Sequence, residues 1–107
     1  MAVNPDITIL MDFYGEMLTE KERDALDYYY NDDLSHTEIA ANTGITRQGV
    51  RDSLKKAEEI LEHAESSLGF LKAWRERQGV ITALDKRLSE LGVRDEAVAS
   101  FIHALRA

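Results

Sequence analysis

SHTEIAANTGITRQGVRDSLKKA, which occupies Ser35–Ala57, is the stretch of this chain that decides its fold. Ser35 and Glu38 have the spacing of a capping box, which predicts a helix that begins here. That helix must end near Gly44, because glycine suits the left-handed backbone that often closes a helix. Thr46 can cap a second helix. The stretch therefore predicts two helices joined by a glycine turn, which is the layout of a helix-turn-helix.

The start of the second helix carries side chains that suit a nucleic acid. A helix-turn-helix lays this part of its second helix in the major groove of DNA. There arginine can donate two hydrogen bonds to guanine, and glutamine can pair with adenine. A threonine cap and the free backbone N–H groups behind it can hold a phosphate, and lysines further along can reach others. The candidate nucleic-acid-binding residues are Thr46, Arg47, Gln48, Arg51, Lys55 and Lys56.

The charge of the chain opposes a simple DNA-binding interpretation. The formal net charge is −7, whereas domains that bind nucleic acid are usually basic. Residues 1–34 hold nine acidic and two basic side chains, whereas residues 35–57 hold four basic and two acidic ones. The candidate helix-turn-helix is therefore the one net-positive segment of an acidic chain.

Helix-forming residues dominate the remainder of the chain, and the sequence predicts an all-α fold. The single proline lies near the N-terminus, and long windows are rich in Ala, Leu, Glu, Lys and Arg. Asn4-Pro5-Asp6 predicts one helix start, and Thr19 with Glu22 predicts another. The second helix of the helix-turn-helix can run to Gly69, since it carries an apolar stripe at helical spacing, namely Val50, Leu54, Ala57, Leu61, Ala64 and Leu68.

Two further helices are expected in the C-terminal third. The first carries a stripe at alternating four-three spacing, comprising Phe70, Trp74, Arg77, Ile81, Leu84, Leu88 and Leu91. Gly79 could kink it, and Gly92 and Asp95 mark the boundary with the last helix. We expect residues 1–69 to form the helix-turn-helix domain and 70–107 to serve packing or dimerisation, within one compact unit. The stripe predicts a homodimer, although it could instead close the core of a monomer.

Several classes of function are disfavoured. The chain has no cysteine, which excludes disulfides, thiol catalysis and cysteine-based metal sites. His36, His63 and His103 lack the spacing of metal ligands and are expected at the surface or near helix caps. There is no glycine-rich phosphate loop and no marked acid–base pair, so we expect neither an enzyme nor a bound cofactor. Because no leader peptide or membrane-length apolar run is apparent, we expect a cytoplasmic protein.

Beyond this generic unit, several segments resemble the YlxM-like family of small bacterial cytoplasmic proteins. They are MDFY at 11–14, LTEKER at 18–23, YYNDDLS at 29–35, EIA at 38–40 and ITRQGVRDSLK at 45–55. The resemblance implies a helix-turn-helix similar to region 4 of sigma factors, although the chain is too short for a complete sigma factor. Gly49 departs from the family, which more often has alanine there. The family's genes usually neighbour that of the signal recognition particle GTPase, which implies a role in that pathway.

Three hypotheses follow for the function. The first is a DNA-binding regulatory protein, acting in the signal recognition particle pathway. The second is an accessory module whose basic helix binds the particle's GTPase or its RNA, the RNA through shape and charge because its major groove is too narrow for a helix. The third is a helical dimer in which the helix-turn-helix is only a scaffold. That third hypothesis gains support if Arg47, Arg51 and Lys55 form ion pairs with the acidic helices.

Overall fold

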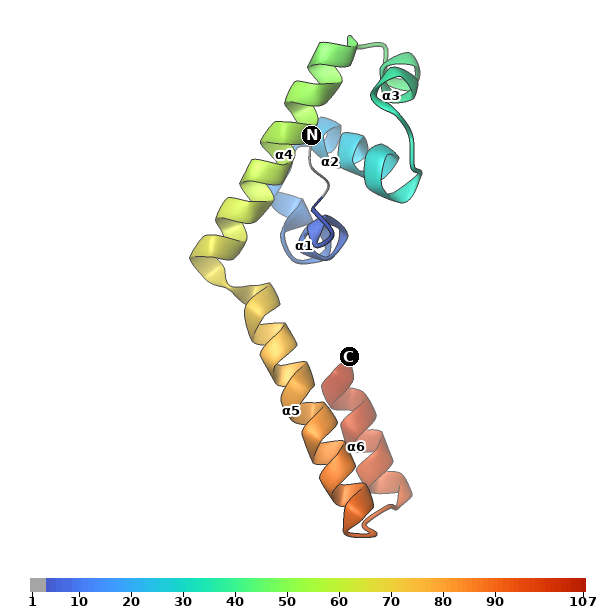
Figure 1. Cartoon of the computed structure of the whole chain (residues 1–107), viewed down its shortest axis with the longest axis vertical. Coiled ribbons are helices and arrows are strands. Elements are labelled where there is room, and N and C mark those ends of the chain that lie inside the picture. Colours follow the sequence, from blue (N-terminus) through green and yellow to red (C-terminus); the bar gives the residue numbers. More distant parts are fainter. Residues whose placement is uncertain (1–3) are drawn as a thin grey trace. The chain divides into compact units, whose positions relative to one another are not determined.

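The computed structural model describes residues 4–107, which contain six α-helices and no strand. The all-α prediction is therefore confirmed. The chain divides into two compact units, one extending to Leu71 and the other comprising Lys72–Ala107. Figure 1 shows the helices in chain order, and each unit is described on its own below.

The first unit opens with α1 (Ile7–Tyr14) and α2 (Glu20–Leu26). Before α1, the Asn4 side chain accepts a hydrogen bond from the Asp6 N–H at 2.9 Å. The helix itself begins at Ile7 with Asp6 at its N-cap, so it starts two residues later than the Asn4-Pro5-Asp6 pattern predicts. A 3₁₀ turn follows α1, and then Thr19 and Glu22 form the predicted capping box at the start of α2. α2 continues as a π-helical turn over Asp27–Asn31.

The helix-turn-helix is formed by α3 (His36–Thr43) and α4 (Arg47–Leu68). Ser35 and Glu38 form the predicted capping box, and Gly44 adopts a left-handed conformation with φ 75°. The Thr46 hydroxyl accepts a hydrogen bond from the Gly49 N–H at 3.0 Å and so caps α4. The turn and both helix starts therefore lie at the predicted residues.

α4 is the central helix of this unit, and α1, α2 and α3 all contact it (Figure 1). Its apolar stripe is buried as predicted from Val50 to Ala64, whereas Leu68 is 49% exposed, in the last turn before Gly69. The partners of this stripe are buried side chains of the other helices, namely Ile7, Leu10, Tyr14, Ala25, Leu26 and Ile39. This packing fixes the orientation of α4 and hence of its outer face.

Two tyrosines hydrogen-bond to glutamates on the inner side of α4. The Tyr14 hydroxyl donates to Glu65 at 2.7 Å and accepts from the Phe70 N–H at 3.0 Å, while Glu65 also accepts from the Leu71 N–H at 2.9 Å. Burial raises the pKa of Tyr14, and its hydrogen bond to Glu65 adds to the shift. These hydrogen bonds connect Phe70 and Leu71, which follow Gly69, to Tyr14 of α1 and Glu65 of α4.

Glu58 is a buried carboxylate on α4, and the Tyr30 hydroxyl donates a hydrogen bond to it. Burial raises the pKa of Glu58 above its ordinary value of 4.5; the bond from Tyr30 lowers it, and Glu62 raises it. The native state thus favours the protonated form. The stability that Glu58 contributes is greatest below about pH 4.5 and is lost as the pH rises through the raised native pKa.

A Glu58→Gln variant should therefore be stabilised relative to the parent protein at neutral pH, because it keeps an acceptor for Tyr30 without a buried charge. The gain should shrink as the pH is lowered toward 4.5. Urea unfolding across this pH range measures the difference. Glu59→Gln is the matched control, because Glu59 is exposed. An equal response of the two variants would contradict the account.

The second unit comprises most of α5 (Phe70–Glu90) together with α6 (Glu96–Arg106), which lie side by side (Figure 1). Gly79 does not interrupt α5, so the kink considered from the sequence is absent. Gly92 (φ 72°) closes α5, and the Asp95 side chain caps α6 by accepting from the Val98 N–H at 2.8 Å. Both helix boundaries match the prediction.

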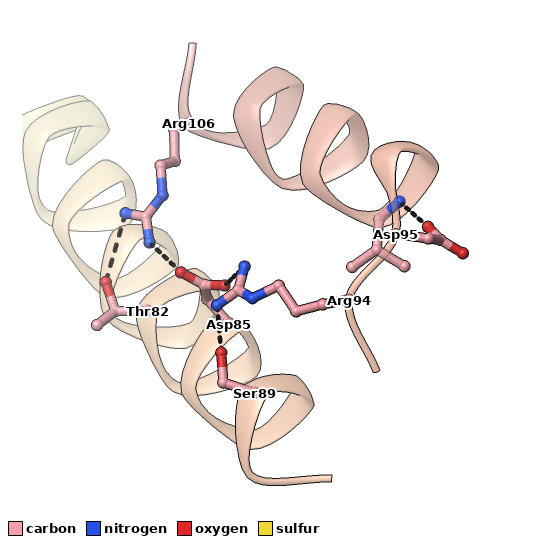
Figure 2. Close-up of polar contacts among 7 residues, drawn as sticks. Thr82, Asp85, Ser89, Arg94, Asp95 and Arg106 are labelled. Carbon is pink, nitrogen blue, oxygen red and sulfur yellow. Dashed lines mark hydrogen bonds and ion pairs between the residues drawn. The ribbon is translucent and has the colours of Figure 1, made fainter. Parts of the chain in front are cut away.

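One flank of this hairpin is joined by polar contacts, which Figure 2 shows. Asp85 of α5 pairs with Arg94 at 3.1 Å and with Arg106 of α6 at 3.7 Å. Arg106 also donates to the Thr82 hydroxyl at 3.5 Å, and Arg94 donates to Ser89. Ile81 and Ile102 are buried, whereas several other large apolar side chains of the hairpin are exposed.

Candidate nucleic-acid interface

The starts of α3 and α4 enclose a cleft of about 750 Å³. Four of the six candidate residues line it: Thr46, Arg47, Gln48 and Arg51. Lys55 and Lys56 lie further along α4 and are exposed, and Lys56 lines a separate apolar hollow. The fold thus gathers the predicted base-reading residues at one cleft and leaves the two lysines outside it.

The cleft also has a wall that the sequence interpretation did not include, formed by Tyr29, Ser35, His36 and Thr37. The His36 ring lies against the Tyr29 ring at a centroid distance of 5.4 Å. His36 is the first residue of α3, so its predicted position near a cap is confirmed. The Ser35–Glu38 capping box was the available sequence signal for this wall. Its two hydrogen bonds fix the start of α3, and that start lines the cleft.

Positive charge on α4 is not neutralised by neighbouring side chains. Arg47, Arg51, Lys55 and Lys56 are all exposed, and none of them forms an ion pair among the residues that the structure describes. The ion pairs that would have supported the scaffold hypothesis are therefore absent from the described residues. Solvated cations of this kind are available to neutralise phosphates.

Gly49 does not disturb the start of α4, although glycine lowers helix propensity. α4 is continuous from Arg47, and the Gly49 N–H donates to the capping hydroxyl of Thr46. A Cβ added at Gly49 would lie 3.2 Å from that hydroxyl oxygen. The glycine therefore gives room to the cap and does not interrupt α4.

An acidic side chain also lies on the exposed side of α4, close to the candidate base-contacting residues. Asp52 is exposed on α4, and its Oδ1 accepts a hydrogen bond from Gln48 Nε2 at 2.8 Å. The sequence interpretation counted Asp52 only as a charge. The spacing of four residues between Gln48 and Asp52 was the available signal, because such pairs meet on a helix surface.

The helix-turn-helix geometry agrees with the family to which the chain is similar. Residues 4–100 match the family model described as UPF0122, "Putative helix-turn-helix protein, YlxM / p13 like". The chain belongs to the UPF0122 family. This confirms the resemblance noted from the sequence and extends it over all of α5 and the first part of α6.

Relatives of this UPF0122 protein occur in several bacteria. A UPF0122 protein of Listeria monocytogenes serovar 1/2a is 37% identical over 100 residues, covering 94% of this chain and 91% of the relative. A UPF0122 protein of Clostridium kluyveri is 41% identical over 88 residues, covering 78% and 79%. One from Bacillus mycoides is 38% identical over 96 residues, covering 90% and 87%. The similarity thus includes both units of the fold.

Residues 4–107 contain neither a candidate membrane span nor a candidate metal-binding cluster. No helix there combines the length and apolar content needed to cross a membrane. No group of three or more histidine or carboxylate side chains in that range is arranged to hold a metal ion. His63 and His103 are exposed, as expected from the sequence.

Proposed function

We propose that this UPF0122 protein is a cytoplasmic DNA-binding regulatory protein with a helix-turn-helix similar to sigma region 4. The observation that carries the proposal is the set of four exposed cations on α4, two of which line the cleft and none of which forms an ion pair within residues 4–107. Residues 35–57 are the one net-positive segment of an acidic chain, and the described residues do not neutralise its cations. Such a surface suits an anionic ligand.

In this proposal α4 enters the major groove by its first two turns. Arg47, Gln48 and Arg51 read base edges, because arginine matches guanine and glutamine matches adenine. Thr46 and the first backbone N–H groups of α4 hold one phosphate, and Lys55 and Lys56 neutralise others. About four neutralised phosphates per protomer correspond to a slope of log affinity against log salt of roughly −3.6.

We further propose that the protein acts as a homodimer through the hairpin of the second unit. Thr82, Asp85 and Arg106 occupy one flank of the hairpin, where ion pairs and a hydrogen bond join the helices. Helical periodicity places the exposed apolar residues on the opposite flank of both helices. They are Leu84 (43% exposed), Leu91 (58%), Phe101 (69%) and Leu105 (48%). We call these four residues the apolar flank.

A second copy is the occupant that suits the apolar flank. The second unit has fewer than 40 residues and only two large buried apolar side chains, too few for such a unit to be stable alone. An aromatic side chain such as Phe101 can bury about 150–250 Å², and three leucines complete the apolar flank. Two copies related by a two-fold axis would cover the apolar flank of each copy with that of the other. The product is a four-helix bundle.

The gene neighbourhood implied by the family resemblance supports a role for this regulator in the signal recognition particle pathway. A second candidate function is therefore an accessory module that binds the particle's GTPase or its RNA through the same cations. In that alternative the acidic segment, residues 1–34, favours a protein partner. A basic surface of that protein would complement the negative charge of the segment.

Crosslinking in cells, followed by recovery of the tagged protein, distinguishes these functions when DNA, RNA and protein are scored together. The proposal predicts discrete chromosomal DNA fragments in the recovered material, and an Arg47→Ala, Arg51→Ala variant should lose them. Recovery of the GTPase or the particle's RNA without DNA would instead establish the accessory module.

A further inference from the structure

We propose that Asp52 is a specificity-determining residue of the DNA-binding face, selecting a cytosine in the major groove and opposing attachment to DNA of other sequence. The inference rests on the proposed function and deepens it. The juxtaposition that carries it is one exposed carboxylate set among the side chains that would read bases and hold phosphates.

Asp52 lies on the outer face of α4, one turn beyond Gln48 and one turn before Lys55 and Lys56. It forms no ion pair with either lysine within the described part of the chain. Its hydrogen-bond partner is Gln48, whose Nε2 donates to Asp52 Oδ1 at 2.8 Å. The amide nitrogen must face the carboxylate, because an ionised carboxylate can only accept hydrogen bonds.

This pairing changes what the helix offers to a base pair. Nε2 gives one of its two hydrogens to Asp52, so Gln48 keeps its carbonyl oxygen and one N–H for a base, and the second Asp52 oxygen is a further acceptor on the outer face. Acceptors in the major groove match exocyclic amino groups, and a carboxylate matches the N4 amino group of cytosine. Guanine and thymine present acceptors at the equivalent edge, so they would face Asp52 without a hydrogen bond. Adenine presents an N6 amino group but sets the N7 acceptor beside it, and a carboxylate is repelled there, whereas cytosine presents only its N4 amino group. The pair therefore favours cytosine at one position.

Asp52 also weakens DNA binding that depends on phosphate contacts alone. A helix that slides out of register brings its outer face toward the phosphates, and a carboxylate is repelled there. Arg51, Lys55 and Lys56 would attract any duplex, whereas Asp52 removes part of that attraction unless its base contact is made. Specificity then arises from a repulsive element beside attractive ones.

A purely structural role predicts something different. A Gln–Asp pair at this spacing stabilises a helix only slightly and would affect only folding. Since Asp52 is exposed, its replacement should leave the fold intact, and binding data remain interpretable.

The test is selection of duplexes from a random-sequence DNA pool by the full chain, the Asp52→Asn variant and a Glu59→Gln control. Glu59 is a second exposed carboxylate on α4, and it lines the apolar hollow outside the cleft. The parent protein and Glu59→Gln should select the same site, with cytosine preferred about tenfold at one position. Asp52→Asn should lose that preference and bind unselected duplex several-fold more tightly.

A cytosine preference that survives Asp52→Asn, with unchanged affinity for unselected duplex, would overturn this inference alone. A parent protein that selects no duplex would remove the proposed function, and the inference with it. Loss of the preference in Glu59→Gln as well would also contradict a specific role for Asp52.

Discussion

An Arg47→Ala, Arg51→Ala double variant is expected to bind duplex DNA at least roughly 30-fold more weakly than the parent protein, since each arginine-to-base contact is worth about 1–3 kcal/mol. Both side chains line the cleft at the start of α4, and neither forms an ion pair in the described part of the chain. Fluorescence anisotropy of a labelled duplex, at one fixed salt concentration, measures the loss.

The fold should survive this double substitution. Exposed side chains without ion pairs typically change the free energy of unfolding by no more than about 0.5 kcal/mol. Lys21→Ala, Arg23→Ala is the matched control, because it removes two exposed positive charges from α2 in the same unit. Equal losses in the two variants would assign the effect to net charge, and unchanged binding by the Arg47, Arg51 variant would contradict the proposed interface.

A Leu84→Glu, Phe101→Glu variant is expected to be monomeric where the parent protein is dimeric. Both residues belong to the apolar flank, and pairing two copies would bury four new carboxylates without partners. Each unpaired buried charge costs about 3–5 kcal/mol, so the dissociation constant should rise by roughly three orders of magnitude or more. Sedimentation velocity over a range of protein concentrations measures this change.

The hairpin itself should remain helical, because Leu84 and Phe101 are already 43% and 69% exposed in a single copy. Ala83→Glu, Ser100→Glu is the matched control, since both residues are exposed and point away from the partner helix by helical periodicity. A parent protein that stays monomeric at high micromolar concentration would contradict the proposed dimer. So would a control variant that dissociates as readily as the Leu84, Phe101 variant.

The helix boundaries could be predicted because their signals are local. Thr19, Ser35 and Thr46 each cap a helix through a hydrogen bond within three residues, and Gly44 and Gly69 end helices with a left-handed backbone. Such contacts depend on a few adjacent residues and are therefore readable from spacing alone. The all-α class and the helix-turn-helix followed from them.

The contacts that could not be predicted join residues distant in the sequence. Tyr30 lies 28 residues from Glu58, and Tyr14 lies 51 residues from Glu65. Adjacent glutamates such as Glu58 and Glu59 are typical of a solvated helix face, whereas packing against α2 and its π-helical turn buries Glu58. No spacing rule within α4 identifies a partner on another helix.

The candidate site was predicted in part for the same reason. Arg47, Gln48 and Arg51 follow from their place at the start of one helix, and the structure brings them to one cleft. Tyr29 and His36 join that cleft only because α3 and the turn after α2 fold against α4. The exposure of Leu84 and Leu91 was likewise unpredictable, since an apolar stripe has the same spacing whether it packs inside one chain or against another.

The most direct measurement of the central claim is a titration of mixed-sequence duplex DNA with the full chain, begun at low salt and repeated over a series of salt concentrations. The account predicts binding whose logarithm falls linearly with log salt, at a slope of roughly −3.6 per protomer and about twice that for a dimer. Absence of binding to duplex DNA at low salt would contradict it.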